Sequence, residues 1–502
     1  MVTCGALHSR RTGVHAVQAA FPLLMLAVAS TVHGQEGPFS ITPSLDQRVT
    51  YTDNARLAPR GEEQSDLIYN VTPSILFTAD GNRVSGRANY AYNNQFYLNE
   101  SERNTASHLI NASGNVELLE NFFFVDGSAT RRERAQTVLD PIGFDDGVGP
   151  DRTTVTTWQI SPYVTQRLGR FANTTARYTY DRVDSQRRST GETYNFDIES
   201  GPTFGRFFWS GNFERQEIRY DDDRPGIPAG ERVTFETVSG TGGVELTSRL
   251  SVFGTVGEER NEFLTTREDI DGSFWNAGFR WNPNVRTSIE GTVGERFFGQ
   301  TRSLDIQHQR RRSVWQASYV QQVSTTRGQI LVPDEDCIEF FLDQGFTPEQ
   351  AFVLCGDQAT VSLAEDVFVS ERAQVSLRYN MRRSRWSLLA FRSERELLSE
   401  RDEADDVRRD DTRYGVQGRF GWDLGARTAW DTTVSRTWVD YDEFDGADDR
   451  RERLWSLRTG LTRQMTDSMR GSLSYRHQQR SSEGEVAGYR ENAVIATLNM
   501  TF

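Results

Sequence analysis

Arginine is the residue type in this sequence whose placement best suits chemistry. All 57 basic residues are arginines, because the sequence contains no lysine. That absence excludes a Schiff-base lysine, a phosphate-loop lysine and a serine–lysine dyad. A guanidinium group offers a planar fork of donors that suits carboxylates and phosphates. Nine arginines lie on the polar side of segments in which polar and apolar residues alternate: Arg87, Arg177, Arg280, Arg372, Arg378, Arg419, Arg458, Arg470 and Arg476.

The nine arginines are interleaved with acidic residues on the same polar faces, among them Asp126, Asp181 and Asp423. We expect these arginines to face the lumen of the fold. In one interpretation they pair with the acids and stiffen the wall. In the other they line a conduit for an anionic solute or polymer. The residue pattern leaves both interpretations open.

The other residue types offer little for catalysis or metal binding. Only His108, His308 and His477 lie beyond the predicted leader sequence, and they are far apart. The acidic run 440–446 invites a calcium interpretation, but Phe444 stands where a loop of this kind needs a ligand. We therefore expect no catalytic residues, no metal site, no cofactor and no enzymatic activity. Binding of divalent cations by the acidic loops is left open.

The elements that position these residues alternate with a period of two. In 413–424, Val416, Phe420 and Trp422 fall on one face, while Arg419 and Asp423 fall on the other. The segments 273–281 and 372–379 repeat this arrangement. Successive side chains of a β-strand point to opposite faces, whereas a helix would scatter these aromatic residues around its axis. The pattern predicts an all-β fold.

Three observations favour a transmembrane barrel over a soluble sandwich. The predicted strands span about nine to fifteen residues, as tilted membrane strands do. Short connections at 80–82, 119–121, 282–284, 424–426 and 466–468 alternate with long ones at 135–152, 221–231, 263–271, 399–411 and 442–450. The last strand is amphipathic and ends in Phe502, which resembles the insertion signal of bacterial outer-membrane barrels.

A sheet that spans a membrane must close on itself, because lipid cannot satisfy backbone amides. We expect an antiparallel up-and-down barrel of about 22 strands. Twenty or eighteen strands remain alternatives, since 299–313 and 39–53 are weakly patterned. An even number places both termini in the periplasm. We expect no plug domain, because the predicted strands begin soon after the leader.

Two segments depart from the strand pattern: a leader and one long loop. Residues 1–34 have the three parts of a secretory signal peptide, which leaves 35–502 for the barrel. The segment 327–364 departs from the strand rhythm and is predicted to be an extended extracellular loop that caps the mouth or folds into the lumen. Cys337 and Cys355 lie in it, and two cysteines in an exported chain most often form a disulfide.

Several short segments of the sequence resemble one family. They are Thr42-Pro43-Ser44-Leu45, Tyr51-Thr52-Asp53-Asn54, Asp66-Leu67-Ile68, Val71-Thr72-Pro73, Arg103-Asn104-Thr105 and Arg382-Arg383-Ser384. The chain resembles the uncharacterised outer-membrane β-barrel family that accompanies PEP-CTERM/exosortase systems in Gram-negative bacteria. The resemblance implies an association with exopolysaccharide production and protein sorting. It carries no catalytic residues.

We therefore expect a porin-like conduit associated with exopolysaccharide export or PEP-CTERM protein sorting. The alternative is a structural or surface-attachment barrel with a closed lumen and acidic loops that bind a partner. Expected partners are outer-membrane lipid, lipopolysaccharide, the barrel assembly machinery and, through the resemblance, exopolysaccharide export components. Nucleic acid is not expected, because the net charge is −14 and the sequence has no basic stripe.

Overall fold

The segments that alternate in the sequence are β-strands in the structure, which is a computed structural model. It describes residues 38–135, 152–185, 188–221, 232–263, 265, 269–331, 367–398, 410–441, 450–483 and 488–502. The predicted signal peptide, Cys337, Cys355 and most of the predicted long loops lie outside these residues.

The described residues form 22 strands. The first eleven are β1 (Phe39–Thr52), β2 (Asp66–Asp80), β3 (Val84–Tyr97), β4 (Thr105–Leu119), β5 (Phe123–Ala135), β6 (Arg152–Leu168), β7 (Ala172–Asp184), β8 (Arg188–Ser200), β9 (Phe207–Tyr220), β10 (Arg232–Thr247) and β11 (Leu250–Glu262). The others are β12 (Gly272–Asn284), β13 (Thr287–Arg296), β14 (Gly299–Gln309), β15 (Ser313–Thr325), β16 (Val367–Asn380), β17 (Ser384–Leu397), β18 (Asp411–Asp423), β19 (Thr428–Tyr441), β20 (Arg450–Gln464), β21 (Met469–Glu483) and β22 (Arg490–Thr501).

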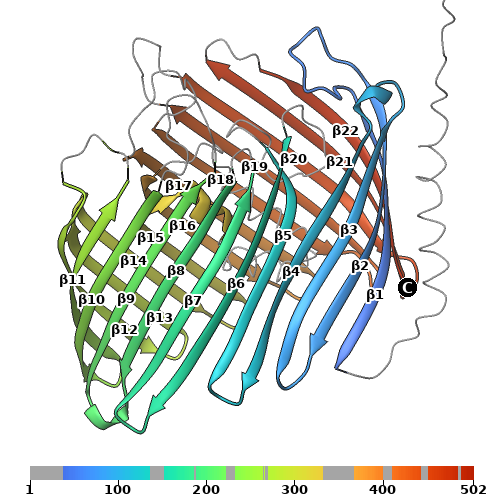
Figure 1. The fold of residues 1–502 in the computed structure, drawn as a ribbon. Coiled ribbons are helices and arrows are strands. Elements are labelled where there is room, and N and C mark those ends of the chain that lie inside the picture. Colours follow the sequence, from blue (N-terminus) through green and yellow to red (C-terminus); the bar gives the residue numbers. More distant parts are fainter. Residues whose placement is uncertain are drawn as a thin grey trace, which may run out of the picture.

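The strands close into one antiparallel barrel (Figure 1). Each strand pairs with the next in the sequence, and β1 pairs with β22 from Ser44 opposite Thr501 to Thr52 opposite Ala493. The two weakly patterned segments are therefore real strands, β1 and β14, and the count of 22 is confirmed. Every strand has two neighbours, so the sheet has no free edge.

Short connections gather at one end of the barrel, which we call the turn end, and the opposite end is the loop end. Four predicted turns are confirmed, for example by the hydrogen bond from Gly81 N–H to Val84 O (2.9 Å). The prediction of a turn at 282–284 is wrong, because these residues belong to β12. The register shifts between Trp281 and Asn284, and Pro283 lacks the amide that a regular ladder needs.

The two faces of the wall differ in polarity. Six outward-facing side chains are 43–57% exposed: Trp275, Trp281, Trp386, Val416, Trp422 and Leu473. Neighbouring strands share hydroxyl pairs on the inner face, such as Ser44–Ser74 (2.6 Å) and Thr130–Thr157 (2.7 Å). An apolar outside and a polar inside are typical of barrels that lipid surrounds.

Helix is scarce in the described part of the chain. It consists of two 3₁₀ turns, η1 (Ser101–Arg103) and η2 (Pro202–Phe204), and one α-helix, α2 (Thr326–Leu331). None of these helices is long and apolar enough to cross a membrane.

Candidate functional site

The candidate site is the lumen, and its wall carries the nine predicted arginines. All nine have the strand parity opposite to that of the exposed apolar row. Arg87, for instance, alternates with the exposed Val84 and Phe96 of β3, and Arg419 with Val416 and Trp422 of β18. The structure thus places the whole set on the inner face, distributed over β3, β7, β12, β16, β18, β20 and β21.

Most of these arginines have partners in the wall. Ion pairs or hydrogen bonds join Arg177 to Asp126 (2.6 Å), Arg280 to Glu290 (2.7 Å), Arg419 to Asp431 (3.2 Å), Arg476 to Glu491 (2.6 Å) and Arg470 to the amide oxygen of Gln464 (3.0 Å). Arg372, Arg378 and Arg458 interact with neighbours as well.

The three predicted acids all form ion pairs, but only one pairs with a predicted arginine. Asp126 pairs with Arg177, whereas Asp423 pairs with Arg385 (3.2 Å) and Asp181 with Arg327. Among the predicted nine, Arg87 is exposed and has no ion-pair partner within the described ranges. Most of the nine arginines therefore fit the first interpretation, in which they pair within the wall. Arg87 fits the second, in which an arginine faces a solute.

The pair of Arg476 and Glu491 lies at the seam where the barrel closes. The side chains of both residues are at most 2% exposed, and two hydrogen bonds (3.0 and 2.6 Å) join them. The hydroxyl of Thr52 in β1 donates a further hydrogen bond (2.8 Å) to the same carboxylate. Because removal of one partner would leave a buried charge, this cluster ties the first strand to the last two.

The start of the predicted extracellular loop lies inside the barrel. The Arg327 side chain in α2 is 1% exposed, pairs with the carboxylate of Asp181 and donates to the Ser189 hydroxyl (3.0 Å). Ile330 packs against Val155 and Val183 on the inner face of β6 and β7. Helix α2 is therefore docked on the opposite wall. The remainder of 327–364, with its cysteines, is outside the described residues.

The loop-end tips of β15–β17 also bend into the barrel. Pairing of β14 with β15 ends at Tyr319, whereas β15 stays paired with β16 up to Thr325. Val323, Val367 and Val369 have the parity of the outer face, since Trp315 of β15 and Val375 of β16 are exposed. Yet Val367 and Val369 are at most 5% exposed.

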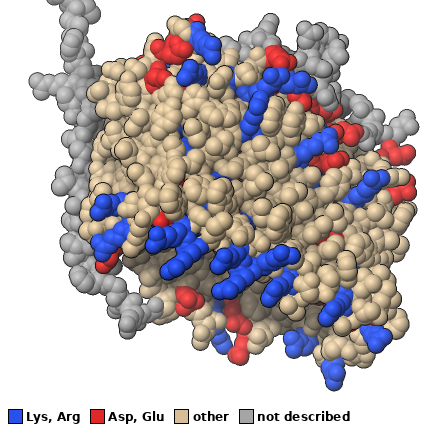
Figure 2. All heavy atoms as spheres, turned by 180° about the vertical axis from the view of Figure 1, so that it is seen from behind, with Lys and Arg blue, Asp and Glu red and all other residues tan. Residues whose placement is uncertain are grey.

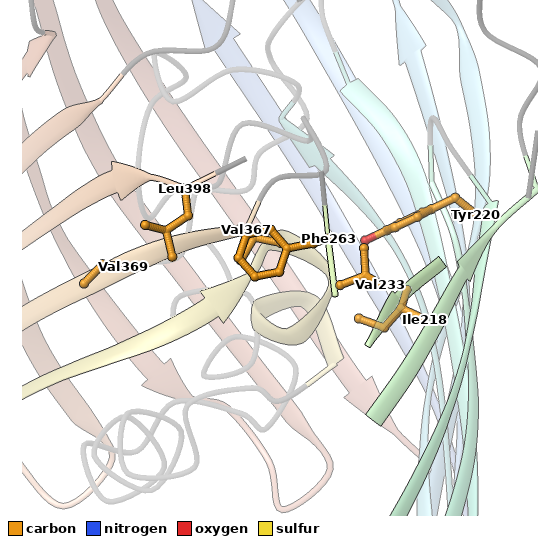
Figure 3. Close-up of a cluster of buried hydrophobic side chains, with 7 residues drawn as sticks. All are labelled: Ile218, Tyr220, Val233, Phe263, Val367, Val369 and Leu398. Carbon is orange, nitrogen blue, oxygen red and sulfur yellow. The ribbon is translucent and has the colours of Figure 1, made fainter. Parts of the chain in front are cut away.

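These tips pack on the inner wall of β9–β11 (Figure 3). One apolar cluster joins Val367, Val369 and Leu398 of the tips to the wall residues Ile218, Tyr220, Val233 and Phe263. The Thr265 hydroxyl also donates a hydrogen bond (2.5 Å) to Leu398 O. We call α2 and the tips, residues 320–331, 367–370 and 396–398, the inner lid. It narrows the barrel toward its loop end.

The sequence predicted that 327–364 caps the mouth or folds into the lumen, and residues 327–331 do lie inside the barrel. It did not reveal that the tips of β15–β17 turn inward as well. Alternation assigns Val323, Val367 and Val369 to the lipid-facing row, and nothing in their immediate sequence says otherwise. The usable signal is the contrast between the 11-residue β14 and the two longer strands that follow it, β15 and β16. A short strand leaves part of the next strand unpaired, and an unpaired tip can turn inward.

The three histidines lie on the outer face of separate strands. His108 contacts the Tyr90 hydroxyl (2.8 Å), His308 the Thr287 hydroxyl (2.7 Å) and His477 the Asn492 side chain (2.7 Å). The structure does not bring them together. The expectation that the protein is not an enzyme stays a prediction.

The fold has known relatives in structure. No protein-family model matches the sequence, and no curated protein matches it. The siderophore receptor PirA from Acinetobacter baumannii matches with a TM-score of 0.53 at 8% identity, over 92% of this chain and 80% of that chain. The FrpB iron transporter from Neisseria meningitidis matches with a TM-score of 0.54 at 9% identity, over 92% and 82%.

At these identities the comparison establishes the fold alone. The chain has the fold of Gram-negative outer-membrane β-barrels. The expectation that no separate plug domain fills the lumen stays a prediction. Within the described ranges, the inner lid is the feature that enters the lumen.

Proposed function

We propose that this chain is an outer-membrane conduit for anionic polar solutes, with both termini in the periplasm and a mouth that the inner lid narrows. The observation that carries the proposal is the inner wall itself. It is polar and bears arginine on strands all around the barrel, in a closed sheet whose outer face suits lipid. Fixed guanidinium groups in a confined space raise the local concentration of anions.

The turn end adds to this charge. Arginines gather at the turns that join β14 to β21, and in Figure 2 basic side chains crowd the lower, turn end of the wall. The arginines in or next to these turns are Arg310, Arg311, Arg312, Arg382, Arg383, Arg427 and, near the end of β20, Arg463. An anion at this end meets a positive rim before it meets the arginines inside. In the proposed orientation the rim faces the periplasm.

Conductance of the refolded protein in a planar bilayer tests the conduit. We expect stable single-channel steps and a preference for chloride over potassium. Replacing Arg87, Arg280, Arg372 and Arg470 together by Glu should abolish or invert that preference. Matched replacements of outward-facing Arg232, Arg260, Arg451 and Arg453 should leave it unchanged. Equal selectivity in both quadruple variants would refute the proposal.

We further propose that the conduit serves exopolysaccharide export, as the family resemblance implies. Deletion of the gene should remove polymer from the culture medium while other outer-membrane proteins keep their normal levels. The wild-type gene should restore export, and the variant with four inner-face glutamates should not. Normal export by the deletion strain would refute this part and leave the conduit itself intact.

A second candidate, a closed structural or surface-attachment barrel, is favoured by the inner lid. Its apolar cluster and its buried Arg327–Asp181 pair hold the wall strands against each other. Acidic loops such as 399–411 and 442–450, most of whose residues lie outside the described ones, would then bind the partner. Swelling of liposomes in sugars of graded size separates the two functions. A size cutoff supports the conduit, and no swelling with folded protein supports the closed barrel.

A further inference from the structure

A recess of about 440 Å³ opens on the inner wall of β3–β6, toward the turn end. Its edge on β6 adjoins the wall on which α2 docks, since Gln159 of the lining pairs in register with Asp181 of β7. Its lining consists of inward-facing side chains and the bare backbone of three glycines: Ser85, Gly86, Arg87, Ser113, Gly114, Asn115, Asp126, Gly127, Ser128, Gln159 and Ser161.

Small residues keep this part of the wall empty. A Cβ atom at Gly86 would lie 2.9 Å from the carbonyl oxygen of Ser113, so glycine allows the backbones of β3 and β4 to approach closely. Ser113 pairs with Arg87 on one side and with Ser128 on the other. Two serines in register, where a longer side chain would reach into the lumen, leave room for a ligand.

At the border of the recess nearer the turn end, the polar side chains already hydrogen-bond to one another. The Asp126 carboxylate accepts hydrogen bonds from Arg177 and from Asn115, both at 2.6 Å. Asn115 also donates to the Tyr163 hydroxyl (3.2 Å), and the Arg177 guanidinium lies 3.9 Å above the Tyr163 ring. Because these groups hold one another, their polar atoms are fixed before a ligand arrives.

The border farther from the turn end carries the positive charge of Arg87. Arg87 is exposed, and within the described part of the chain it has no ion-pair partner. The hydroxyls of Ser85, Ser113 and Ser128 likewise make no side-chain hydrogen bond with described residues. Asp126 forms its ion pair with Arg177 and accepts a second hydrogen bond from Asn115. The recess therefore combines one available guanidinium with several hydroxyl and amide groups.

We propose that this recess binds a carboxylate-bearing sugar, either a free uronic acid or a uronate unit of a polymer. The carboxylate pairs with Arg87, whose planar fork suits it. The sugar hydroxyls exchange hydrogen bonds with the serines and with Gln159. The inference deepens the proposed conduit by naming its solute class, and it rests on that function only for the route by which the sugar arrives.

Calorimetric titration of the refolded protein in detergent tests the site, with glucuronate, a trigalacturonate and glucose as probes. We expect at least one uronate to bind and glucose to bind far more weakly. Arg87→Gln should weaken uronate binding by about tenfold or more, because a charged hydrogen-bonded pair is lost. Arg260→Gln is the control, since Arg260 is an exposed arginine on the outer face of the wall, and it should bind as the wild type does.

The outcomes separate the site from the conduit. Binding of glucuronate assigns the free acid, and binding of the trimer alone assigns the polymer. Folded protein that binds neither uronate, or an Arg87→Gln variant that binds as tightly as the wild type, overturns the recess. A channel that conducts anions without uronate affinity fails only this inference. A silent barrel that binds uronate through Arg87 fails only the proposed conduit.

Discussion

The inner walls of β3–β6 and of β9–β11 follow the same alternation and differ in what covers them. Around the recess on β3–β6 the inward positions are serine, asparagine, glutamine, aspartate and arginine, and they line an open hollow. On β9–β11 the inward positions near the loop end include Ile218, Tyr220 and Val233, all at most 4% exposed, because the inner lid covers them. The comparison shows that apolar inward residues mark where another part of the chain docks.

Of the substitutions that follow, loss of the buried charge pair should disturb the covered wall most. Arg327→Ala leaves the Asp181 carboxylate buried without its partner, which costs about 3–5 kcal/mol. We expect α2 to leave the wall and the single-channel conductance to rise toward that of a barrel without a lid. The double variant Arg327→Met/Asp181→Leu removes both charges and should restore the low conductance. An unchanged conductance in Arg327→Ala would contradict a lid role for α2.

Truncation of the apolar contact should have the next largest effect. Ile218 is fully buried beneath the tips, so Ile218→Ala should lower the free energy of unfolding by about 2–5 kcal/mol. Urea titration followed by tryptophan fluorescence measures this. Val238→Ala, on the outer face of β10 and 49% exposed, is the control and should change stability by less than about 0.5 kcal/mol. Equal effects of the two substitutions would mean that the lid does not bury this wall.

How far the sequence predicts this molecule follows from what alternation encodes. Alternation records which side chains share a face of a strand, so it predicted the strands and the faces of Arg87 and Arg419. Strand length, the alternation of short and long connections and the amphipathic last strand then predicted a barrel of about 22 strands. It does not record where a face leaves the lipid. Val367 and Val369 have the parity of lipid-facing residues, but their tip turns inward once β14 has ended. The Arg327–Asp181 pair joins residues 146 positions apart, and no local pattern brings them together.

The sequence predicted some residues of the recess but not their arrangement. Arg87 and Asp126 were recognised as inward-facing, but their proximity depends on the register of β3, β4 and β5. That register places Gly86 beside Gly114 and Ser113 beside Ser128. A shift of one residue would turn the serines outward and remove the recess.

A methyl group at Gly86 tests how closely β3 and β4 approach behind the recess. Gly86→Ala should cost about 1–3 kcal/mol, since the new Cβ would lie 2.9 Å from backbone that cannot move aside freely. Gly240→Ala in β10 is the control, because no atom lies within 4 Å of its Cβ position. Urea titration of both variants measures the difference. A smaller loss for Gly86→Ala than for Gly240→Ala would mean that β3 and β4 do not approach so closely.

The smallest expected effect is on stability at the recess itself. Ser113 has a hydroxyl that bonds to no described side chain, so Ser113→Ala should change the free energy of unfolding by less than about 0.5 kcal/mol. Binding of the uronate should nevertheless weaken by about threefold, as expected for one lost neutral hydrogen bond. Urea and calorimetric titrations of the same preparation measure the two quantities. An inward wall that packs against nothing is free to be polar, so its side chains matter for a solute and little for the fold, whereas at Ile218 this order is reversed.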